Sequence, residues 1–515
     1  MEALHLIAIF IFSYLLLKLF FLAPKPKHTA KLPPSPPSLP IIGHLHLLKK
    51  PLHRSLSLLS EQYGPILYLR LGYRPTLVIS SPQLVDECFT TNDVALANRP
   101  NFPSVKELTN NYSNLAFSNY GPSWRHLRKT ATVQILSNHR LLLSTSSRND
   151  EARYLAHRLF VRSADDKSSF NKVNVKAIAF EFVLNVIMGM IAGKRYYGEE
   201  TKDWEEARWF RQMMEEFFAL APGSRFMDFF PWLRLVDSIS SLRQLKSVVK
   251  KRTEFSQRLI DEIRKGIDAQ KKKTMIGNLL RLQEREPGEY NDDLIRTLSL
   301  TLLQAGTETS SNTIEWAMSL LLNNPHVLAK AQHEIHTVVG RDRLLEESDV
   351  PSLPYLRAII NETLRLHPAA PLNLPHESAS DSIIGGYKIP KGTTIYINIH
   401  AIHQDPSIWK DPTEFKPERF ENGKGEGLWL LPFGMGRRKC PGEGLAIKMI
   451  ALALGTLIQC FEWQRIGSKE VDMTEGSNGF AVPKAVSLDA LYRPWSDMVP
   501  LLMGLQCASV VVLSD

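Results

Sequence analysis

One cysteine, Cys440, constrains the fold more than any other residue. It follows a stretch rich in glycine and cations, 433–439, and it precedes an apolar pattern with helical spacing. A thiol at the start of a helix faces backbone N–H groups that favour its anion, and nearby cations act in the same direction. Glycine permits unusual dihedral angles and close approach to a large flat group. The stretch therefore predicts a metal-ligating thiolate with a lowered pKa. The alternative is that Cys440 is a small buried hydrophobe.

The pattern around this cysteine is Phe-Gly-x-Gly-x-Arg-x-Cys-x-Gly, from Phe433 to Gly442. In a chain of this composition it should arise by chance only on the order of a few times in a million. The pattern resembles the haem-binding signature of the cytochrome P450 family. The resemblance implies haem b with Cys440 as the axial thiolate and with Phe433 and Gly434 at the cofactor. It also implies the cytochrome P450 fold, mainly α with a smaller β portion, as a single large haem domain behind an N-terminal transmembrane helix.

The composition narrows the class of protein and its expected partners further. The 515 residues are 44% hydrophobic and 22% charged, which suits a large globular domain. Four scattered cysteines form neither a metal-binding pair nor a disulfide framework, as is typical of a reducing compartment. The net charge of +9 is spread among 53 acidic residues, so we expect a membrane lipid surface or an acidic protein partner and no nucleic acid.

The N-terminal 19 residues from Leu4 to Leu22 are almost wholly apolar and long enough to cross a bilayer. A cleaved signal peptide is the alternative, but no basic region precedes the run and no clear cleavage site follows it. Lysines after the run place the bulk of the chain in the cytoplasm. By resemblance, the protein is a single-pass endoplasmic reticulum protein. We predict an anchor over 1–23, a basic and proline-rich hinge over 24–45, a catalytic domain over 46–500, and an apolar tail of unknown role over 501–515.

Secondary structure can be read from periodicity and turn residues. Residues 66–80 alternate in the manner of a hairpin, with a turn near Gly72. Most segments after residue 120 have the spacing of amphipathic helices. The longest runs over 291–322 and is ended by Pro325. Strand character returns over 383–398.

Inside the longest helix, residues 305–310 place a glycine and three hydroxyls against their helical propensities. Hydroxyls that bond back to a carbonyl can loosen the helix and open a groove. A relieved kink is the alternative. The stretch resembles the oxygen-activation motif of the cytochrome P450 family. By that resemblance Thr309 donates a hydrogen bond to dioxygen and Glu308 takes part in relaying protons.

An acid and a base at i and i+3, Glu362 and Arg365, share a face of another predicted helix. Such a pair is usually a solvated ion pair. By resemblance, however, Arg419 joins them in a buried triad that serves folding and haem retention.

Haem carries two propionates, so its rim needs cations and donors. Trp124 and Arg128 are spaced i and i+4, which by itself is typical of a generic amphipathic helix. The resemblance assigns them, together with Arg438, to propionate binding. His376 stands where many relatives carry arginine, and its charge depends on pH.

Motifs near residues 33–37, 97–100 and 474–485 are similar to those of plant microsomal enzymes of the eighty-one family. That group acts on isoflavonoids, lignans, indole glucosinolates, terpenoids and herbicides. Analogy with the family gives pocket-lining residues whose apolar character predicts a hydrophobic, mainly uncharged substrate, although each could equally be core. These residues are Phe102, Phe217, Phe218, Ala305, Leu372, Leu374 and Phe480.

The resemblance implies a monooxygenase that inserts one atom of O2 into a plant metabolite and reduces the other to water. The chain has no dinucleotide fingerprint, so NADPH is expected to bind a separate cytochrome P450 reductase. That partner would dock on a basic face formed by Arg125, Lys129, Arg437, Lys439 and Lys448. Two alternatives stay open. One is a haem-thiolate isomerase or dehydratase that needs no reductase, and the other is a non-catalytic haem-binding or lipid-binding membrane protein.

Overall fold

The computed structural model describes residues 14, 32–163, 167–198, 204–219, 226–230, 232, 239–266, 273–423, 429–476 and 481–505. Its α-helices are α2 (Leu52–Tyr63), α3 (Pro82–Phe89), α4 (Pro103–Leu108), α5 (Pro122–Ala131), α6 (Asn138–Leu143), α7 (Thr145–Arg162), α8 (Val175–Ala192), α9 (Trp204–Ala219), α10 (Phe226–Phe229), α11 (Ile239–Lys265), α12 (Met275–Arg285), α13 (Asp292–Asn323), α14 (Pro325–Val338), α15 (Pro354–Leu366), α16 (Ile399–His403), α17 (Glu443–Cys460) and α18 (Val499–Gly504). Short helical turns are η1 (Leu45–Leu47), η2 (Thr132–Leu136), η5 (Glu347–Ser352), η6 (Pro417–Gly423) and η7 (Gly436–Arg438). The strands are β1 (Ile66–Leu71), β2 (Arg74–Ile79), β3 (Asn171–Asn174), β4 (His376–Glu377), β5 (Ser382–Ile384), β6 (Tyr387–Ile389), β7 (Thr394–Ile397), β8 (Phe461–Gln464) and β9 (Asp489–Pro494).

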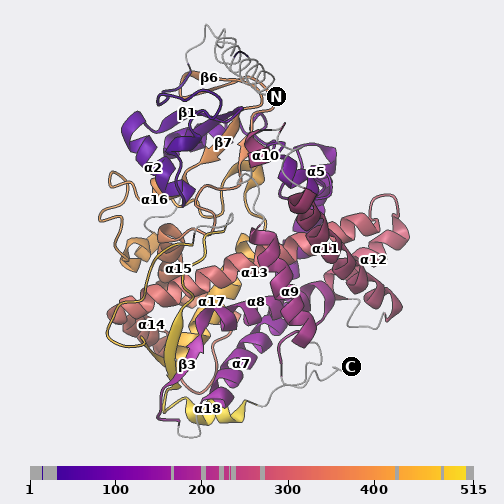
Figure 1. Cartoon of the computed structure of the whole chain (residues 1–515). Coiled ribbons are helices and arrows are strands. Elements are labelled where there is room, and N and C mark those ends of the chain that lie inside the picture. Colours follow the sequence, from indigo (N-terminus) through magenta and orange to yellow (C-terminus); the bar gives the residue numbers. More distant parts are fainter. Residues whose placement is uncertain are drawn as a thin grey trace, which may run out of the picture.

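A small sheet region lies at one end of a much larger helical part (Figure 1). Its main sheet has the order β1-β2-β7-β4, in which β1 and β2 form an antiparallel hairpin and β7 pairs parallel to β2. Gly72 turns this hairpin with φ +60°, and an added Cβ would lie 2.6 Å from the Phe229 carbonyl oxygen. The strands predicted over 66–80 and 383–398 are thus confirmed, as is a mainly α fold with a smaller β portion.

The longest helix, α13, runs through the middle of the helical part (Figure 1). Its first turn is capped by Asn291, whose side chain accepts a hydrogen bond from the Leu294 N–H. Two aspartates, Asp292 and Asp293, complement the positive end of the helix dipole. Pro325 begins α14 directly afterwards, so α13 ends where the sequence predicts.

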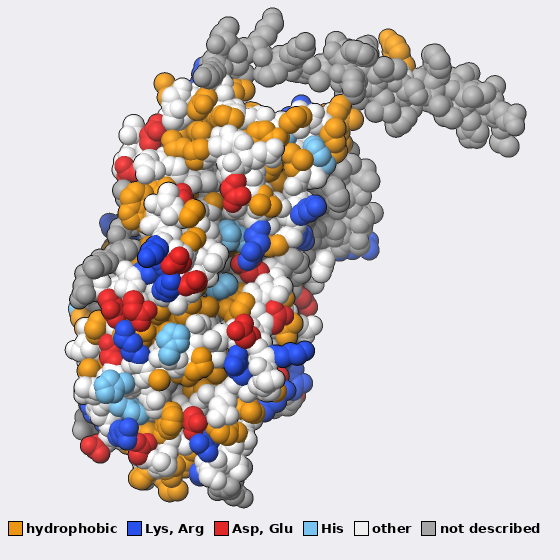
Figure 2. Space-filling model, turned by 90° about the vertical axis from the view of Figure 1, so that its left-hand side faces the viewer, with side chains coloured by type: hydrophobic (Ala, Val, Ile, Leu, Met, Phe, Trp, Pro, Cys, Tyr) orange, Lys and Arg blue, Asp and Glu red, His pale blue; other side chains and the backbone are white. Residues whose placement is uncertain are grey.

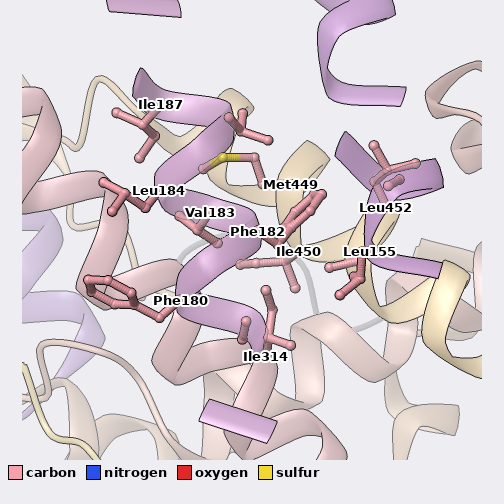
Figure 3. Close-up of a cluster of buried hydrophobic side chains, with 14 of the residues drawn as sticks. Leu155, Phe180, Phe182, Val183, Leu184, Ile187, Ile314, Met449, Ile450 and Leu452 are labelled. Carbon is pink, nitrogen blue, oxygen red and sulfur yellow. The ribbon is translucent and has the colours of Figure 1, made fainter. Parts of the chain in front are cut away.

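The core is built around α8, whose apolar side chains pack against α7, α13 and α17 (Figure 3). Phe182 belongs to the same buried cluster as Ile314 of α13 and Met449 and Ile450 of α17 (Figure 3). By length and hydropathy, α8 and α17 could each cross a membrane. However, 72% of each span is buried inside the protein, as in core helices of a globular domain.

The predicted membrane anchor over 1–23 lies outside the described residues except for Tyr14. Residues 24–31 of the predicted hinge and 506–515 of the predicted tail also lie outside them. The part of the hinge that is described, from Leu32, has no helical turn before η1, in keeping with its prolines. The domain limits themselves stay predictions.

Candidate active site

The loop that carries Cys440 depends on glycine at two positions. Gly434 and Gly436 have φ of +71° and +69°, the left-handed region that other residues rarely adopt. A Cβ on Gly436 would also lie 2.5 Å from Oδ1 of Asp93. The backbone N–H of Cys440 donates to the Phe433 carbonyl at 2.9 Å, which closes the loop just before α17 begins.

The structure contradicts the expectation that the pKa of the Cys440 thiol is lowered. Burial raises the pKa of its thiol above the ordinary value. The backbone N–H groups of Gly442 and Glu443 and the charge of Arg128 act in the predicted direction, but they do not outweigh the loss of solvation. The prediction of a lowered pKa was therefore wrong, because the sequence does not show how much protein surrounds the sulfur. Bound iron would hold this sulfur as thiolate regardless.

The exposed positions of Cys440 and of Ala305 on α13 indicate a hollow between the cysteine loop and this helix. The Cys440 side chain is exposed although loss of solvation dominates its pKa, so it borders an enclosed space rather than the outer surface. Ala305 is likewise exposed in the middle of α13, although its neighbours Gln304 and Thr307 are buried. Because α13 packs against both α17 and α5, these exposed positions indicate a hollow between α13 and the cysteine loop. A flat cofactor needs such a space.

The predicted oxygen-side residues occupy the same stretch of α13. The Thr309 hydroxyl donates to the Ala305 carbonyl at 2.6 Å, which is the back-bond that the sequence predicts. The helix nevertheless continues through this point. Glu308 Oε1 accepts from Nζ of Lys176 on α8 at 2.8 Å, and Lys176 is 9% exposed. The sequence analysis missed Lys176, although a lysine that opens an otherwise apolar helix was a usable signal.

Two arginines near Cys440, Arg438 and Arg128, have N–H donors without a partner among the described residues. Arg438 donates through Nε to the Ala97 carbonyl at 2.7 Å and through Nη2 to the Ser118 carbonyl at 2.6 Å. Its Nη1 is buried and has no partner among the described residues. Burial and the charge of Arg128 lower the pKa of Arg438 to about 10, so it stays charged at neutral pH. Arg128, whose pKa burial also lowers, makes no hydrogen bond or ion pair within the described part of the chain.

Trp124 and His376, the other residues predicted to bind the haem propionates, already donate hydrogen bonds to backbone carbonyls. The Trp124 indole N–H donates to the Leu115 carbonyl at 3.0 Å, and its ring lies 4.2 Å from the Arg438 guanidinium carbon. His376 must donate through Nδ1 to the Leu96 carbonyl at 2.8 Å, since a carbonyl only accepts. Its Nε2 is buried and unpartnered among the described residues. Burial, with repulsion from nearby arginines, holds the pKa of His376 well below its ordinary value.

The donor set fits a cofactor with carboxylates on its rim. Arg438 Nη1 and the Arg128 guanidinium supply free donors and positive charge beside Cys440. A carboxylate near His376 would favour the protonated form of this histidine, in which Nε2 donates. Haem meets these requirements. Arg438, Arg128 and His376 would hold its propionates, whereas Trp124 would have to exchange its present acceptor.

The acid and base of α15 lie together and are fully buried. Arg365 donates through Nε and Nη2 to the two carboxylate oxygens of Glu362, at 2.7 and 2.8 Å. Arg419 Nε and the Lys416 N–H donate to Oε1 of the same carboxylate, at 3.0 and 2.9 Å. Arg365 Nη1 also reaches the His403 carbonyl at 2.7 Å. The network therefore ties α15 to α16 and to the segment before η6.

The predicted pocket residues separate into core and cavity positions. Phe102 is 1% exposed and packs with Val105 and Phe117, and Leu374 packs on that cluster while Leu372 packs on another. Phe217 is half-buried against the cluster that contains Leu108. Ala305 borders the hollow. The side chain of Phe218 and the whole of Phe480 lie outside the described residues.

A second cluster of titratable groups lies between α2 and α16. Glu475 accepts from His53 Nε2 at 3.1 Å and from Arg54 Nε at 2.7 Å. His53, His400 and Glu475 bring possible ligand atoms within 4.8 Å of one another, but Arg54 already neutralises the carboxylate. His367 lies 3.9 Å from this carboxylate, between Nδ1 and Oε1. The cluster holds the segment around Glu475 against the sheet region.

Three histidines whose pKa values are lowered in the folded protein predict acid sensitivity. Burial lowers the pKa of His367, His400 and His403 to about 3 in each case. In the unfolded chain each binds a proton below pH ~6.5. Between pH ~6.5 and ~3 the unfolded state therefore binds more protons, so stability falls as pH decreases, by up to ~1.4 kcal/mol per pH unit for each histidine. Denaturant midpoints measured from pH 7.5 to 5 should show this decline.

A matched pair of variants checks the cause of the decline. His403→Gln should reduce the dependence of stability on pH by about one proton. His139→Gln, at an exposed position, should leave the dependence unchanged. Equal slopes for His403→Gln and the parent protein would contradict this assignment.

Comparisons with known proteins agree with the fold. The family model "Cytochrome P450" matches residues 33–486. The chain is 46% identical over 496 residues to the isoflavone 2'-hydroxylase of Glycyrrhiza echinata, which covers 96% of this chain and 98% of that protein. It is 47% identical over 467 residues to the (+)-piperitol/(+)-sesamin synthase of Sesamum radiatum, with 90% and 91% covered. It is 46% identical over 495 residues to cytochrome P450 81D1 of Arabidopsis thaliana, with 95% and 96% covered.

Fold, cysteine loop and relatives together define an oxidoreductase of the haem-thiolate monooxygenase class, which binds haem b through a cysteine thiolate. The chain belongs to the cytochrome P450 family. The relatives carry the names of the eighty-one family, which confirms the resemblance that the motifs indicated.

Proposed function

We propose that this monooxygenase takes electrons from NADPH through a separate cytochrome P450 reductase and oxidises a hydrophobic plant specialised metabolite, such as a flavonoid, lignan or terpenoid. The observation that carries the proposal is the hollow bordered by Ala305 on α13 and Cys440 on the opposite side. The names of the relatives support the substrate class, since they include isoflavone hydroxylases and a sesamin synthase. Hydroxylation and ring closure are both within this chemistry.

Two side chains of α13 carry the proposed catalytic roles. Haem bound at Cys440 supplies the site of oxygen reduction, with electron donation from sulfur. Thr309 would turn its hydroxyl from the Ala305 carbonyl toward the hollow and donate a hydrogen bond there. Glu308 would pass protons from the side on which Lys176 holds it. The Glu362, Arg365 and Arg419 network would fix the elements that retain haem.

Membrane attachment is part of the proposal. Residues 1–23 would form a single anchor in the endoplasmic reticulum, with the catalytic domain in the cytoplasm. Support comes from exposed hydrophobic side chains near the start of the described chain and around the β1–β2 turn: Leu39 (45%), Ile41 (42%), Ile42 (37%) and Tyr73 (52%). Figure 2 shows hydrophobic side chains gathered at this end of one face, with acidic and basic side chains interspersed elsewhere.

The basic face proposed for the reductase is only partly available. Arg437 pairs with Asp93 at 3.0 Å, Lys439 with Glu443 at 2.7 Å, and Lys448 with Glu347 at 2.5 Å. Arg125 and Lys129 are exposed and make no ion pair with a described residue. We therefore assign docking mainly to these two cations on α5, next to the cysteine loop.

Reconstitution with reductase, NADPH and a panel of isoflavones, lignans and terpenes tests the proposal. Oxygenated product that requires both NADPH and reductase is expected, detected as a mass increase of one oxygen or the loss of two hydrogens. Thr309→Ala should consume NADPH with at least ~100-fold less product, because a positioned proton donor contributes about 100- to 10,000-fold. Turnover without NADPH would instead indicate an isomerase or dehydratase. No product from any substrate would favour a non-catalytic role.

A further inference from the structure

A buried arginine that the sequence does not single out contacts the residue next to Ala305 on α13. Arg252 of α11 is 5% exposed. Its Nη1 donates to the Leu108 carbonyl at the end of α4, at 3.0 Å. Its Nη2 donates to Oε1 of Gln304 on α13, at 2.7 Å. The guanidinium carbon lies 4.2 Å from the centre of the Phe217 ring on α9. Four helices therefore converge on this one cation.

The position of Gln304 connects this arginine to the hollow. Gln304 directly precedes Ala305, the exposed residue in the middle of α13. Phe217, which covers the guanidinium, is only half-buried. Arg252 of α11 thus contacts the α13 residue next to Ala305, and the Phe217 ring covers its guanidinium group. Movement of that ring would open it to a bound molecule.

The charge of Arg252 has no counter-charge within the described part of the chain. No ion pair joins it to a carboxylate there, and burial alone lowers its pKa to about 9, so it stays protonated at neutral pH. A buried cation without a partner is costly, and natural proteins keep such groups mainly at functional sites. Arg148 shows the contrast, because it is equally buried and pairs with Glu347 at 2.5 Å.

The unpartnered atoms define what could bind. Arginine only donates, so Gln304 must present its oxygen to Arg252 and turn its amide nitrogen away. Gln304 Nε2 and Arg252 Nε are both buried and lack an acceptor among the described residues. The pair therefore offers two free donors and a positive charge. Its complement is an oxygen with free lone pairs.

We propose that Arg252 and Gln304 form a polar subsite that binds an acceptor oxygen, either a carboxylate or phenolate or a neutral conjugated carbonyl, at one end of an otherwise apolar substrate. The inference rests on the proposed function and refines it, because the sequence predicted a mainly uncharged ligand. The subsite would hold the substrate by the end remote from the oxidised atom. It would thereby select among apolar molecules of similar size.

Three probes of equal shape test the subsite: 2-naphthoate, 2-acetylnaphthalene and 2-isopropenylnaphthalene. They carry an anionic acceptor, a neutral acceptor and no acceptor on the same ring system. Isothermal titration calorimetry on the oxidised holoprotein, without reductase or NADPH, gives each Kd. One or both oxygen probes should bind at least ~10-fold tighter than the alkene, the scale expected for a hydrogen bond to a charged donor. The ratio between the two oxygen probes then identifies the acceptor class.

Variants test whether Arg252 and Gln304 cause the difference in affinity between the probes. Arg252→Met and Gln304→Leu should each bring the probes to within ~3-fold of one another, and Gln304→Leu covers the case in which Arg252→Met does not fold. Arg258→Met, at an exposed arginine of the same helix, should leave the ratios unchanged. Alkene binding as tight as that of both oxygen probes in the parent protein, or discrimination that survives both subsite variants, would overturn the proposal. Because no turnover is measured, a failure of the proposed enzymatic function would remain a separate result.

Discussion

Replacing Cys440 with serine is expected to abolish the long-wavelength Soret band of the reduced protein under carbon monoxide and to reduce product formation to background. The band reports sulfur bound to iron, and serine has no sulfur to donate electron density. The backbone N–H groups of Gly442 and Glu443 and the Arg128 cation favour an anion at this position, but a serine hydroxyl does not ionise near neutral pH. Absorption spectra and the reconstituted assay measure both losses.

Cys460 provides the matched control. It is fully buried at the far end of α17, and within the described part of the chain it packs only in the core. Cys460→Ala should keep the band and most activity while it lowers stability by about 1 kcal/mol, the cost of a lost buried sulfur. A Cys440→Ser protein that retained the band would show that another residue ligates the iron, and the proposed site would be wrong.

Features set by nearby residues could be predicted from the sequence. The Asn291 cap, the two aspartates after it and Pro325 define α13 within the span of the helix itself. The hairpin turn at Gly72 needs only a positive φ between two alternating runs. The cysteine loop likewise needs glycine at Gly434 and Gly436 because of its own backbone. Local sequence determines local geometry in each case.

Features that depend on distant segments could not be predicted. Lys176 meets Glu308 across 132 residues, and Arg252 meets Leu108 across 144. The pKa of Cys440 depends on how many protein atoms surround the sulfur, so the favourable helix N-terminus alone gave the wrong direction. Whether a side chain such as Trp124 has a free donor also depends on which carbonyl the fold brings to it. These properties follow from packing rather than from motif spacing.

The buried triad of Glu362, Arg365 and Arg419 was predicted in part from the sequence, and the fold adds the rest. The spacing of Glu362 and Arg365 predicts a pair on one helix face, and the resemblance adds Arg419. The structure shows that the same carboxylate also receives the Lys416 N–H and that Arg365 reaches the His403 carbonyl. One carboxylate therefore accepts hydrogen bonds from two guanidinium groups and orders the chain between α15 and η6.

Glu362→Gln is expected to destabilise the protein by about 3–5 kcal/mol and to prevent stable haem retention. Both residues of the pair are 0% exposed, so Arg365 would keep its charge without a counter-ion. The amide oxygen could replace only one of the two carboxylate oxygens, and the amide nitrogen in the other position would face an N–H donor. Denaturant midpoints and the ratio of haem to protein should both fall, and much of the protein should be insoluble.

A graded series separates this mechanism from general fragility. Arg419→Gln removes a partner that is 11% exposed and leaves Glu362 paired with Arg365, so we expect a smaller loss of about 1–3 kcal/mol. Asp150→Asn breaks an exposed i,i+3 pair with Arg153 and should cost less than ~0.5 kcal/mol. The expected loss of stability decreases in the order Glu362, Arg419, Asp150, because the stranded charge is progressively less buried. Equal losses at Glu362 and Asp150 would contradict it, because the Glu362 variant strands buried charge and the Asp150 variant does not.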